Sequence, residues 1–104
     1  MPVSIVFTTV SSLDEAETLA AKIVEQRLAA CVQIVPAVTS VYFWEGEVRR
    51  EEERMLLIKT LAEKFDALEA FIQANHSYGL PEIVGVEAEH ISKPYLDWLT
   101  EYLR

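Results

Sequence analysis

The sequence predicts an α+β domain with a ferredoxin-like βαββαβ fold: a four-stranded antiparallel sheet, two helices on one of its faces, and an extra C-terminal helix. Two observations lead to this prediction. Segments rich in β-branched and aromatic residues alternate with segments of helical periodicity in the order β-α-β-β-α-β, which is the split βαβ arrangement. The chain has 104 residues, so we expect one domain, residues 1–104, with an ordinary hydrophobic core.

Composition and capping residues indicate the first strand and the first helix. Val3 to Val10 is rich in β-branched residues, which is typical of a strand. Ser12 and Glu15 have the spacing of a capping box, and apolar residues at helical intervals follow them. We therefore expect a helix that extends from this box to about Leu28.

A long hairpin is predicted for the middle of the chain. Glu45-Gly46 separates an extended run, residues 31–44, from a returning strand at about residues 48–60. Pro36 interrupts the first of these strands and cannot donate a ladder hydrogen bond, so we expect a bend, a bulge or a sheet edge there. Residues 47–54 are almost wholly charged, which is the ordinary composition of a solvent-exposed tip.

The second half of the chain repeats the helix and strand pattern. A helix is expected over residues 62–75, where apolar residues share one face, and a fourth strand over residues 83–88. Residues 92–103 predict a closing helix, because Pro94 falls in its first turn.

The predicted strands are apolar on both faces, whereas a sheet with one face in water alternates apolar with polar residues. The apolar residues at odd and even positions are Val3, Ile5 and Phe7 with Val6 and Val10, Met55 and Leu57 with Leu56 and Ile58, and Ile83 with Val84 and Val86. A contiguous apolar patch of this kind marks a partner surface, and a second copy of the chain is the simplest partner.

The formal net charge of −8 argues against nucleic acid as a partner, because phosphate binding needs clustered Lys and Arg. It equally disfavours an anionic membrane surface. The single cysteine, Cys31, excludes an intrachain disulfide and multi-cysteine zinc sites, and it fits a reducing compartment. Since neither a signal-peptide pattern nor a membrane-length apolar run is present, we expect a soluble cytoplasmic protein.

The chain resembles the CutA family of divalent-cation-tolerance proteins over nearly its whole length. Five segments carry this resemblance in the same order along the chain: Arg27–Val32, Ser40–Gly46, Ile58–Thr60, His76–Glu82 and Tyr95–Leu99. The resemblance implies a ferredoxin-like subunit in a tight homotrimer, with sheets packed edge to edge around a three-fold axis. It also implies an architecture similar to that of the PII-type nitrogen-signalling proteins, which bind ligands in clefts between subunits. The implied role is copper or divalent-metal binding and metal tolerance, without an enzymatic activity.

The sequence departs from the family pattern at several positions. Ser77 and Gly79 stand where the usual His-Pro-Tyr-Glu-x-Pro-Glu motif has proline and glutamate. Asn75 and Thr8 stand where members with proposed copper ligands have a second histidine and a cysteine. Of these ligand positions, His76 carries over.

His76 and Cys31 are the candidate metal ligands. An imidazole at a helix end either binds a metal or caps backbone carbonyls. Cys31 starts an apolar run, where a cysteine is commonly a small core residue, although soft copper prefers a thiolate to a carboxylate. Because this set lacks the ligand count of a closed site, we expect copper or another divalent cation to bind weakly and in a pH-dependent way.

Four further residues are candidates for lining a ligand cleft: Lys59, Tyr78, Glu82 and Trp44. Lys59 lies within an apolar strand, so it is paired, snorkelling or lining a pocket. Glu82 is a candidate partner for Lys59, or it caps backbone groups. Tyr78 and Trp44 are large amphipathic side chains that either pack or stack on a ligand.

The sequence leaves two functions open. In the first, a homotrimer binds metal in intersubunit clefts, where the His76 loop of one chain approaches Cys31 or Lys59 of another. In the second, a PII-like signalling scaffold binds a small anion or a protein in those clefts without metal. An enzyme of the acylphosphatase type is disfavoured, because the first strand-helix junction carries neither a glycine-rich anion loop nor an arginine.

Overall fold

The computed structural model describes residues 2–104 and confirms the α+β prediction. The elements follow one another in the predicted order: β1 (Val3–Val10), α1 (Leu13–Glu25), β2 (Cys31–Trp44), β3 (Glu47–Leu61), a short 3-10 turn (Ala62–Lys64), α2 (Phe65–Asn75), β4 (Val84–Ala88) and α3 (Lys93–Leu103).

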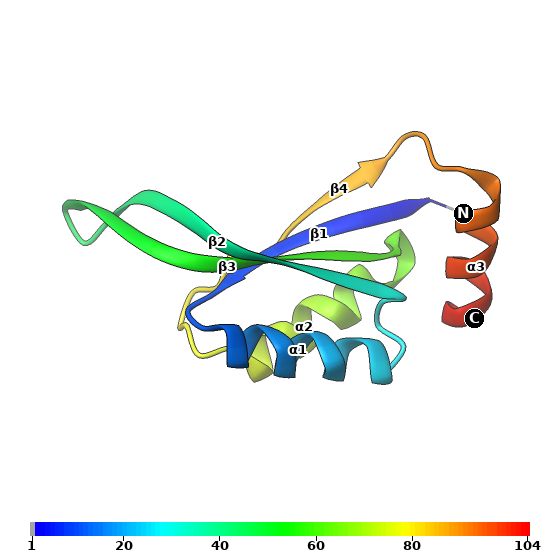
Figure 1. The fold of residues 1–104 in the computed structure, drawn as a ribbon, viewed down its shortest axis with the longest axis horizontal. Helices are drawn as coiled ribbons and strands as arrows, with labels where there is room; N and C mark the ends of the chain where they lie inside the picture. The colour runs from blue at the N-terminus through cyan, green and yellow to red at the C-terminus, as the bar shows by residue number, and fades with distance from the viewer. Residues whose placement is uncertain (1) are drawn as a thin grey trace.

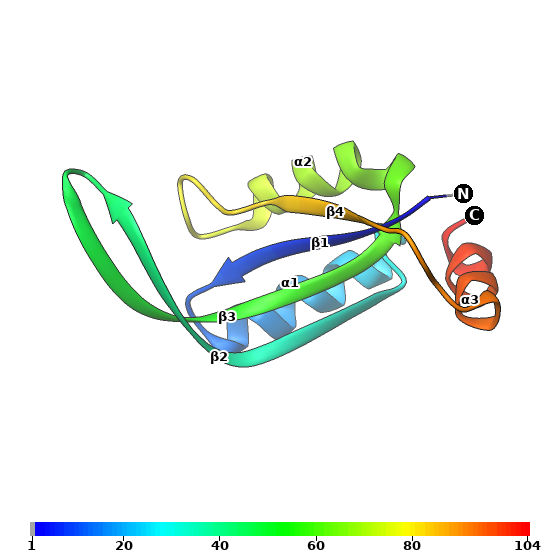
Figure 2. The ribbon, with the colours of Figure 1, turned by 90° about the horizontal axis from the view of Figure 1, so that it is seen from above.

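The strands form one antiparallel sheet in the order β2-β3-β1-β4, which is the ferredoxin-like arrangement. Helices α1 and α2 lie side by side on one face of this sheet, and α3 lies beyond the strand ends, near the start of β1 (Figures 1 and 2). Among residues 2–104, none of the helices combines the length and the hydropathy that crossing a bilayer requires.

The main core lies between the sheet and the two long helices. Even-numbered residues of β1 and β3 meet α1 and α2, because strand side chains alternate between the two faces. The fully buried members of this core include Val6, Val10, Leu56 and Ile58 from the strands, with Ala16, Ile23, Leu68 and Ile72 from the helices. Burying one such large side chain stabilises the fold by about 1.5–3 kcal/mol.

The other face of the sheet is covered only at one end. There, Leu99 and Leu103 of α3 pack against Val3 and Leu61. The other apolar residues of this face include the half-buried Ile5, Phe7, Val35, Met55 and Leu57 and the exposed Val84 and Val86, and we call the surface that they form the open face. Val84 and Val86 are 51% and 46% exposed, so this chain alone does not bury the second apolar face that the sequence indicated.

The β2–β3 hairpin extends well beyond the sheet and gives the molecule extents of 44 × 25 × 23 Å (Figure 1). Its register shifts between Val35 and Val38, which confirms the irregularity predicted at Pro36. We call the part beyond this bulge, residues 38–53, the hairpin arm. The tip turns at Glu45 and Gly46, whose φ angles of 50° and 81° are both positive, as a tight two-residue hairpin turn requires.

Helix α1 ends earlier than predicted, at Glu25 instead of about Leu28. Arg27 has a φ of 56°, in the left-handed region that ends a helix. Its guanidinium donates a hydrogen bond to the Tyr102 carbonyl at 2.6 Å and lies 4.5 Å from the centre of the Tyr102 ring. This contact with α3 favours the early helix end, which helical periodicity alone does not reveal.

Two buried threonines on the helix-covered face differ in their hydrogen bonding. Thr8 and Thr60 are both 0% exposed, and Thr60 Oγ1 donates to the Leu28 carbonyl at 2.7 Å. Thr8 Oγ1 has no hydrogen-bond partner within residues 2–104. A buried hydroxyl without a partner destabilises the folded state, whereas the Thr60 hydroxyl is paired. Replacing the hydroxyl at these two positions should therefore change stability in opposite directions.

We expect Thr8→Val to raise the free energy of unfolding by about 1 kcal/mol, because it removes the unpaired hydroxyl and keeps the side-chain shape. Thr60→Val, the control, should lower that free energy by about 1 kcal/mol, because it leaves the Leu28 carbonyl unpaired. Urea unfolding at a fixed protein concentration measures both. Equal losses in the two variants would show that Thr8 is as well paired as Thr60.

Candidate functional site

The loop from His76 to Glu82 joins α2 to β4 and is anchored through the His76 ring. The His76 side chain is 0% exposed, and its Nε2 lies 2.8 Å from the Thr9 carbonyl oxygen at the end of β1. Its Nδ1 lies 3.0 Å from the Tyr78 backbone nitrogen. Because the carbonyl only accepts and the amide only donates, the network assigns the neutral tautomer with the proton on Nε2.

Hydrogen bonds occupy both ring nitrogens, and a metal would need one of them. An imidazole binds a metal through a ring lone pair, and the one lone pair of this tautomer, on Nδ1, accepts from Tyr78. Metal binding by His76 therefore requires the loop backbone to turn away from Nδ1. The contacts give His76 a structural role, but the carbonyl that its ring bonds belongs to β1 and not to the end of α2. The role of His76 as a ligand stays a prediction.

Glu15 at the start of α1 holds the loop from its other side. Its Oε2 accepts from the Ser77 amide at 3.1 Å, and its Oε1 accepts from the Ser77 hydroxyl at 3.0 Å. Burial raises the pKa of the Glu15 carboxyl, but the Ser77 hydrogen bonds, the nearby His76 and the Ser11 hydroxyl outweigh burial and leave this pKa below its usual value. Ser77 is thus paired with a carboxylate through groups that a proline at this position would lack.

The capping box at α1 forms only in part. Ser12 Oγ accepts from the Glu15 amide at 3.1 Å, as predicted. The Glu15 carboxylate bonds Ser77 and Ser11 instead of completing the box at the Ser12 amide. Sequence reasoning missed Glu15 as a loop residue, because its spacing from Ser12 already explained it.

Tyr78 links the loop to the hairpin. Its hydroxyl donates to Glu53 Oε2 at 2.7 Å, and its ring centre lies 4.8 Å from that of His76. Burial, followed by the hydrogen bond to Glu53 and the charge of that residue, raises the pKa of the Tyr78 hydroxyl well above its ordinary value. Glu53 is only 7% exposed, so the prediction of an exposed charged tip over residues 47–54 is wrong at this residue.

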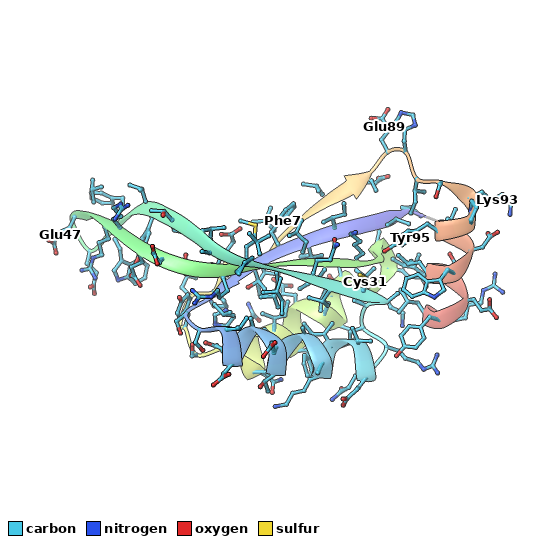
Figure 3. All side chains as sticks on the ribbon, viewed as in Figure 1. Phe7, Cys31, Glu47, Glu89, Lys93 and Tyr95 are labelled. Carbon is cyan, nitrogen blue, oxygen red and sulfur yellow. The ribbon has the colours of Figure 1, made fainter. Side chains whose placement is uncertain are left out.

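Cys31 and Lys59 form a separate group under α3. They are directly opposed across the β2–β3 ladder, and Cys31 is half-buried. Lys59 Nζ lies 5.6 Å from the centre of the Tyr95 ring, and Figure 3 shows Cys31 and Tyr95 at the α3 end of the sheet. Burial and the neighbouring Cys31 raise the pKa of Tyr95. The cation of Lys59 thus faces an aromatic ring, and no ion pair joins it to Glu82 in the part of the chain described.

One chain brings the predicted residues together only in two pairs, His76 with Tyr78 and Cys31 with Lys59. Lys59 is level with Ile5 on β1, four residues from the Thr9 that holds His76, which is about 13 Å along a strand. Glu82 is exposed, and Trp44 is 42% exposed near the hairpin tip. Within residues 2–104, no three His, Cys, Asp or Glu side chains converge as a metal site would require.

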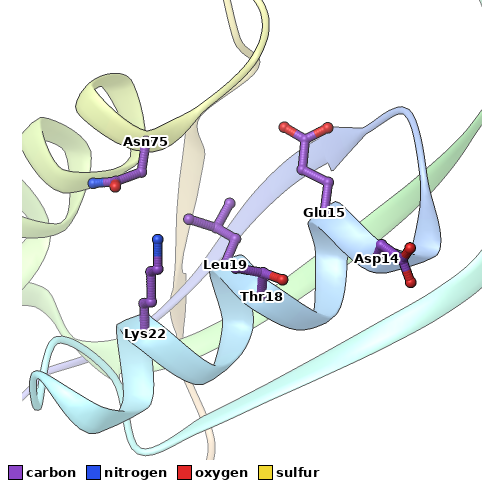
Figure 4. Close-up of a pocket in the computed structure, with 6 residues that line it drawn as sticks. All are labelled: Asp14, Glu15, Thr18, Leu19, Lys22 and Asn75. Carbon is purple, nitrogen blue, oxygen red and sulfur yellow. The ribbon is translucent and has the colours of Figure 1, made fainter.

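A shallow groove of about 220 Å³ lies between α1 and the end of α2. Figure 4 shows the residues that line it: Asp14, Glu15, Thr18, Leu19, Lys22 and Asn75. Of these, Glu15 belongs to the loop network. The groove is smaller than the roughly 300–1,000 Å³ typical of small-molecule sites, so it does not by itself indicate a ligand.

The sequence model of the CutA1 divalent ion tolerance protein family matches residues 4–102, which is almost the whole chain. The chain belongs to the CutA family. It is 46% identical over 97 residues to the divalent-cation tolerance protein CutA of Thermus thermophilus, covering 93% of this chain and 94% of that protein.

The crystal structure of CutA1 from Oryza sativa has the same fold, with a TM-score of 0.97, 39% identity, and coverage of 100% of this chain and 95% of that chain. A curated rice relative, Protein CutA 1, chloroplastic, is 39% identical over 104 residues, and this chain spans 59% of its length. These matches confirm the resemblance inferred from the five sequence segments.

The Glu15 network predicts a dependence of stability on pH. The pKa of this carboxyl is lower in the folded protein than its ordinary value of 4.5, so its stabilising effect is complete above that value and is lost as pH falls through the folded pKa. Glu15→Gln should therefore be less stable than the unmodified protein near neutral pH, and the difference should shrink in acid as the pH falls below 4.5.

Urea unfolding across this pH range, at one protein concentration, measures the difference. Glu17→Gln is the control, since Glu17 is an exposed carboxylate on the same helix. If Glu15→Gln lowers the free energy of unfolding by the same amount at every pH, the result would contradict the proposed role of the Ser77 hydrogen bonds.

Proposed function

We propose that this CutA-family protein is a homotrimer that binds divalent metal ions, copper among them, and acts in the tolerance of these ions. Membership of a family named for divalent ion tolerance supports the general role. Two observations carry the proposal further: the candidate metal ligands of one chain form two separate groups, and the described part of the chain leaves an apolar sheet face uncovered. Assembly would cover that face and bring groups of different chains together.

The open face supports self-association on physical grounds. Its residues include Phe7, Leu57, Val84 and Val86, which come from three adjacent strands and form a contiguous apolar surface. A monomeric protein rarely leaves such a surface in water. The three-fold symmetry of the proposed assembly comes from the resemblance to the CutA family.

The burial and the hydrogen bonds of the candidate metal ligands support weak metal binding. Cys31 is half-buried and Glu82 is exposed, so both can approach a metal between chains. His76 would have to give up the Tyr78 amide, although Glu15 Oε2, 3.9 Å from Nδ1, is placed to share a cation with it. Breaking that hydrogen bond offsets part of the binding free energy.

The metal-free alternative remains a second candidate, favoured by the hydrogen bonds on both nitrogens of His76. In it, the clefts would bind a small anion or a protein, and Lys59 would supply the charge.

We further propose that the protein is not an enzyme and that it is cytoplasmic. Cell fractionation with an antibody against the protein tests the second of these, and recovery outside the cytosol would overturn it.

We expect sedimentation equilibrium at micromolar concentration to give the mass of a trimer. Leu57→Glu should dissociate it, because a charge at the centre of the open face cannot be buried without a partner. Leu13→Glu is the control, since Leu13 is apolar and 43% exposed on α1, away from the open face. A monomer mass for the unmodified protein would overturn the proposed assembly.

Copper binding should weaken as pH falls from about 7.5 to about 5.5, because an imidazole binds metal only when it is neutral. His76→Ala should lower the affinity about tenfold at the higher pH. His90→Ala is the control, because the side chain of His90, the only other histidine, is 93% exposed. Calorimetric titration of the reduced protein measures both, and identical isotherms for His76→Ala and the unmodified protein would exclude His76.

A further inference from the structure

The hairpin arm leaves the sheet at a point where the β ladder is irregular. The register shifts between Val35 and Val38, and Glu53 opposite Val38 forms the first residue pair of the arm. A bulge bends its strand and increases the local twist. The direction of the arm is therefore decided at this level, and Figure 2 shows the arm projecting from the same end of the sheet as the loop between α2 and β4.

Glu53 is an unusual residue for the base of this arm. The other glutamates of the arm are exposed, whereas Glu53 is 7% exposed. A buried carboxylate is unfavourable unless hydrogen bonds compensate for the lost water. The Tyr78 hydroxyl, 2.7 Å away, supplies such a bond from a residue 25 positions later in the chain.

Tyr78 is itself held firmly to the body of the domain. Its amide donates to His76 Nδ1, and His76 Nε2 donates to the Thr9 carbonyl of β1. A continuous series of hydrogen bonds therefore joins the central strand β1 to Glu53. The raised pKa of the Tyr78 hydroxyl keeps this donor protonated over the physiological pH range.

We propose that the hydrogen bond between Tyr78 and Glu53 is a clamp that fixes the angle of the hairpin arm, so that the arm docks on a second copy of this chain. The docking half of this inference rests on the self-association proposed above. The arm carries exposed apolar residues, among them Val41 at 64%, Phe43 at 71% and Val48 at 75%. Holding them at one angle before contact reduces the conformational entropy that docking removes.

The chain contains a matched control for the clamp. Tyr42 also donates its hydroxyl to a glutamate, Glu51, but both residues lie within the arm and both are exposed. Tyr42→Phe and Tyr78→Phe therefore remove the same chemical group from a phenol–carboxylate pair. Only the second change removes a link between the arm and the body of the domain.

Amide hydrogen exchange of the full chain tests the clamp. We expect Tyr78→Phe to speed exchange in residues 38–53 about tenfold, while exchange in β1 and α1 stays near that of the unmodified protein. Tyr42→Phe should leave exchange at the base of the arm unchanged. Unchanged exchange in the arm, or an equal rise throughout the domain, would overturn the clamp.

Glu53→Gln provides a second route if Tyr78→Phe folds poorly, because it keeps an acceptor oxygen but removes the charge. We expect it to speed exchange in the arm by less than Tyr78→Phe does. Exchange in the arm no faster than in the unmodified protein would count against the clamp.

Sedimentation equilibrium tests the docking role of the arm independently of the clamp. For a protein that assembles, Tyr78→Phe should raise the concentration at which the complex dissociates by about tenfold. Faster exchange in the arm with unchanged dissociation would overturn the docking role. A monomeric unmodified protein would overturn both the proposed assembly and the docking role, while the exchange data would still decide the clamp.

Discussion

Strand alternation is the constraint on which the rest of this structure depends. Because successive side chains of β1 and β3 point to opposite faces, residues such as Val6 and Ile58 must be buried under α1 and α2. Their neighbours Phe7 and Leu57 must then lie on the other face. A one-residue slip in register would exchange these sets, so the helices and the open face are two consequences of one pairing.

The His76 ring plays a comparable part on a smaller scale. It joins β1, through Thr9, to the loop that carries Tyr78, and Tyr78 continues the connection to Glu53 on β3. Each member of this series is buried or half-buried, where an unpaired polar group is costly. The loop that most resembles a ligand site is therefore also a structural junction.

Because this loop is both a candidate ligand site and a structural junction, its hydrogen bonds affect how this chain could bind a metal. In the body of the domain, His76 and Cys31 belong to different local environments, one with saturated hydrogen bonds and one beside Lys59 and Tyr95. A metal that used both would need two chains and some rearrangement of the loop. Such a ligand set is suited to weak, reversible binding more than to a structural metal.

The sequence by itself determined the order of the elements, the irregularity at Pro36, the apolar character of both sheet faces and the CutA resemblance. Each of these is encoded locally, in periodicity, in a missing amide proton or in short segments. The tertiary structure alone decided the roles of Glu15 and Glu53. Their partners, Ser77 and Tyr78, are 62 and 25 residues away, and contacts over such separations depend on how strands and helices pack. For the same reason, the protonated nitrogen of His76 follows from Thr9, 67 residues earlier in the chain, and not from its own neighbours alone.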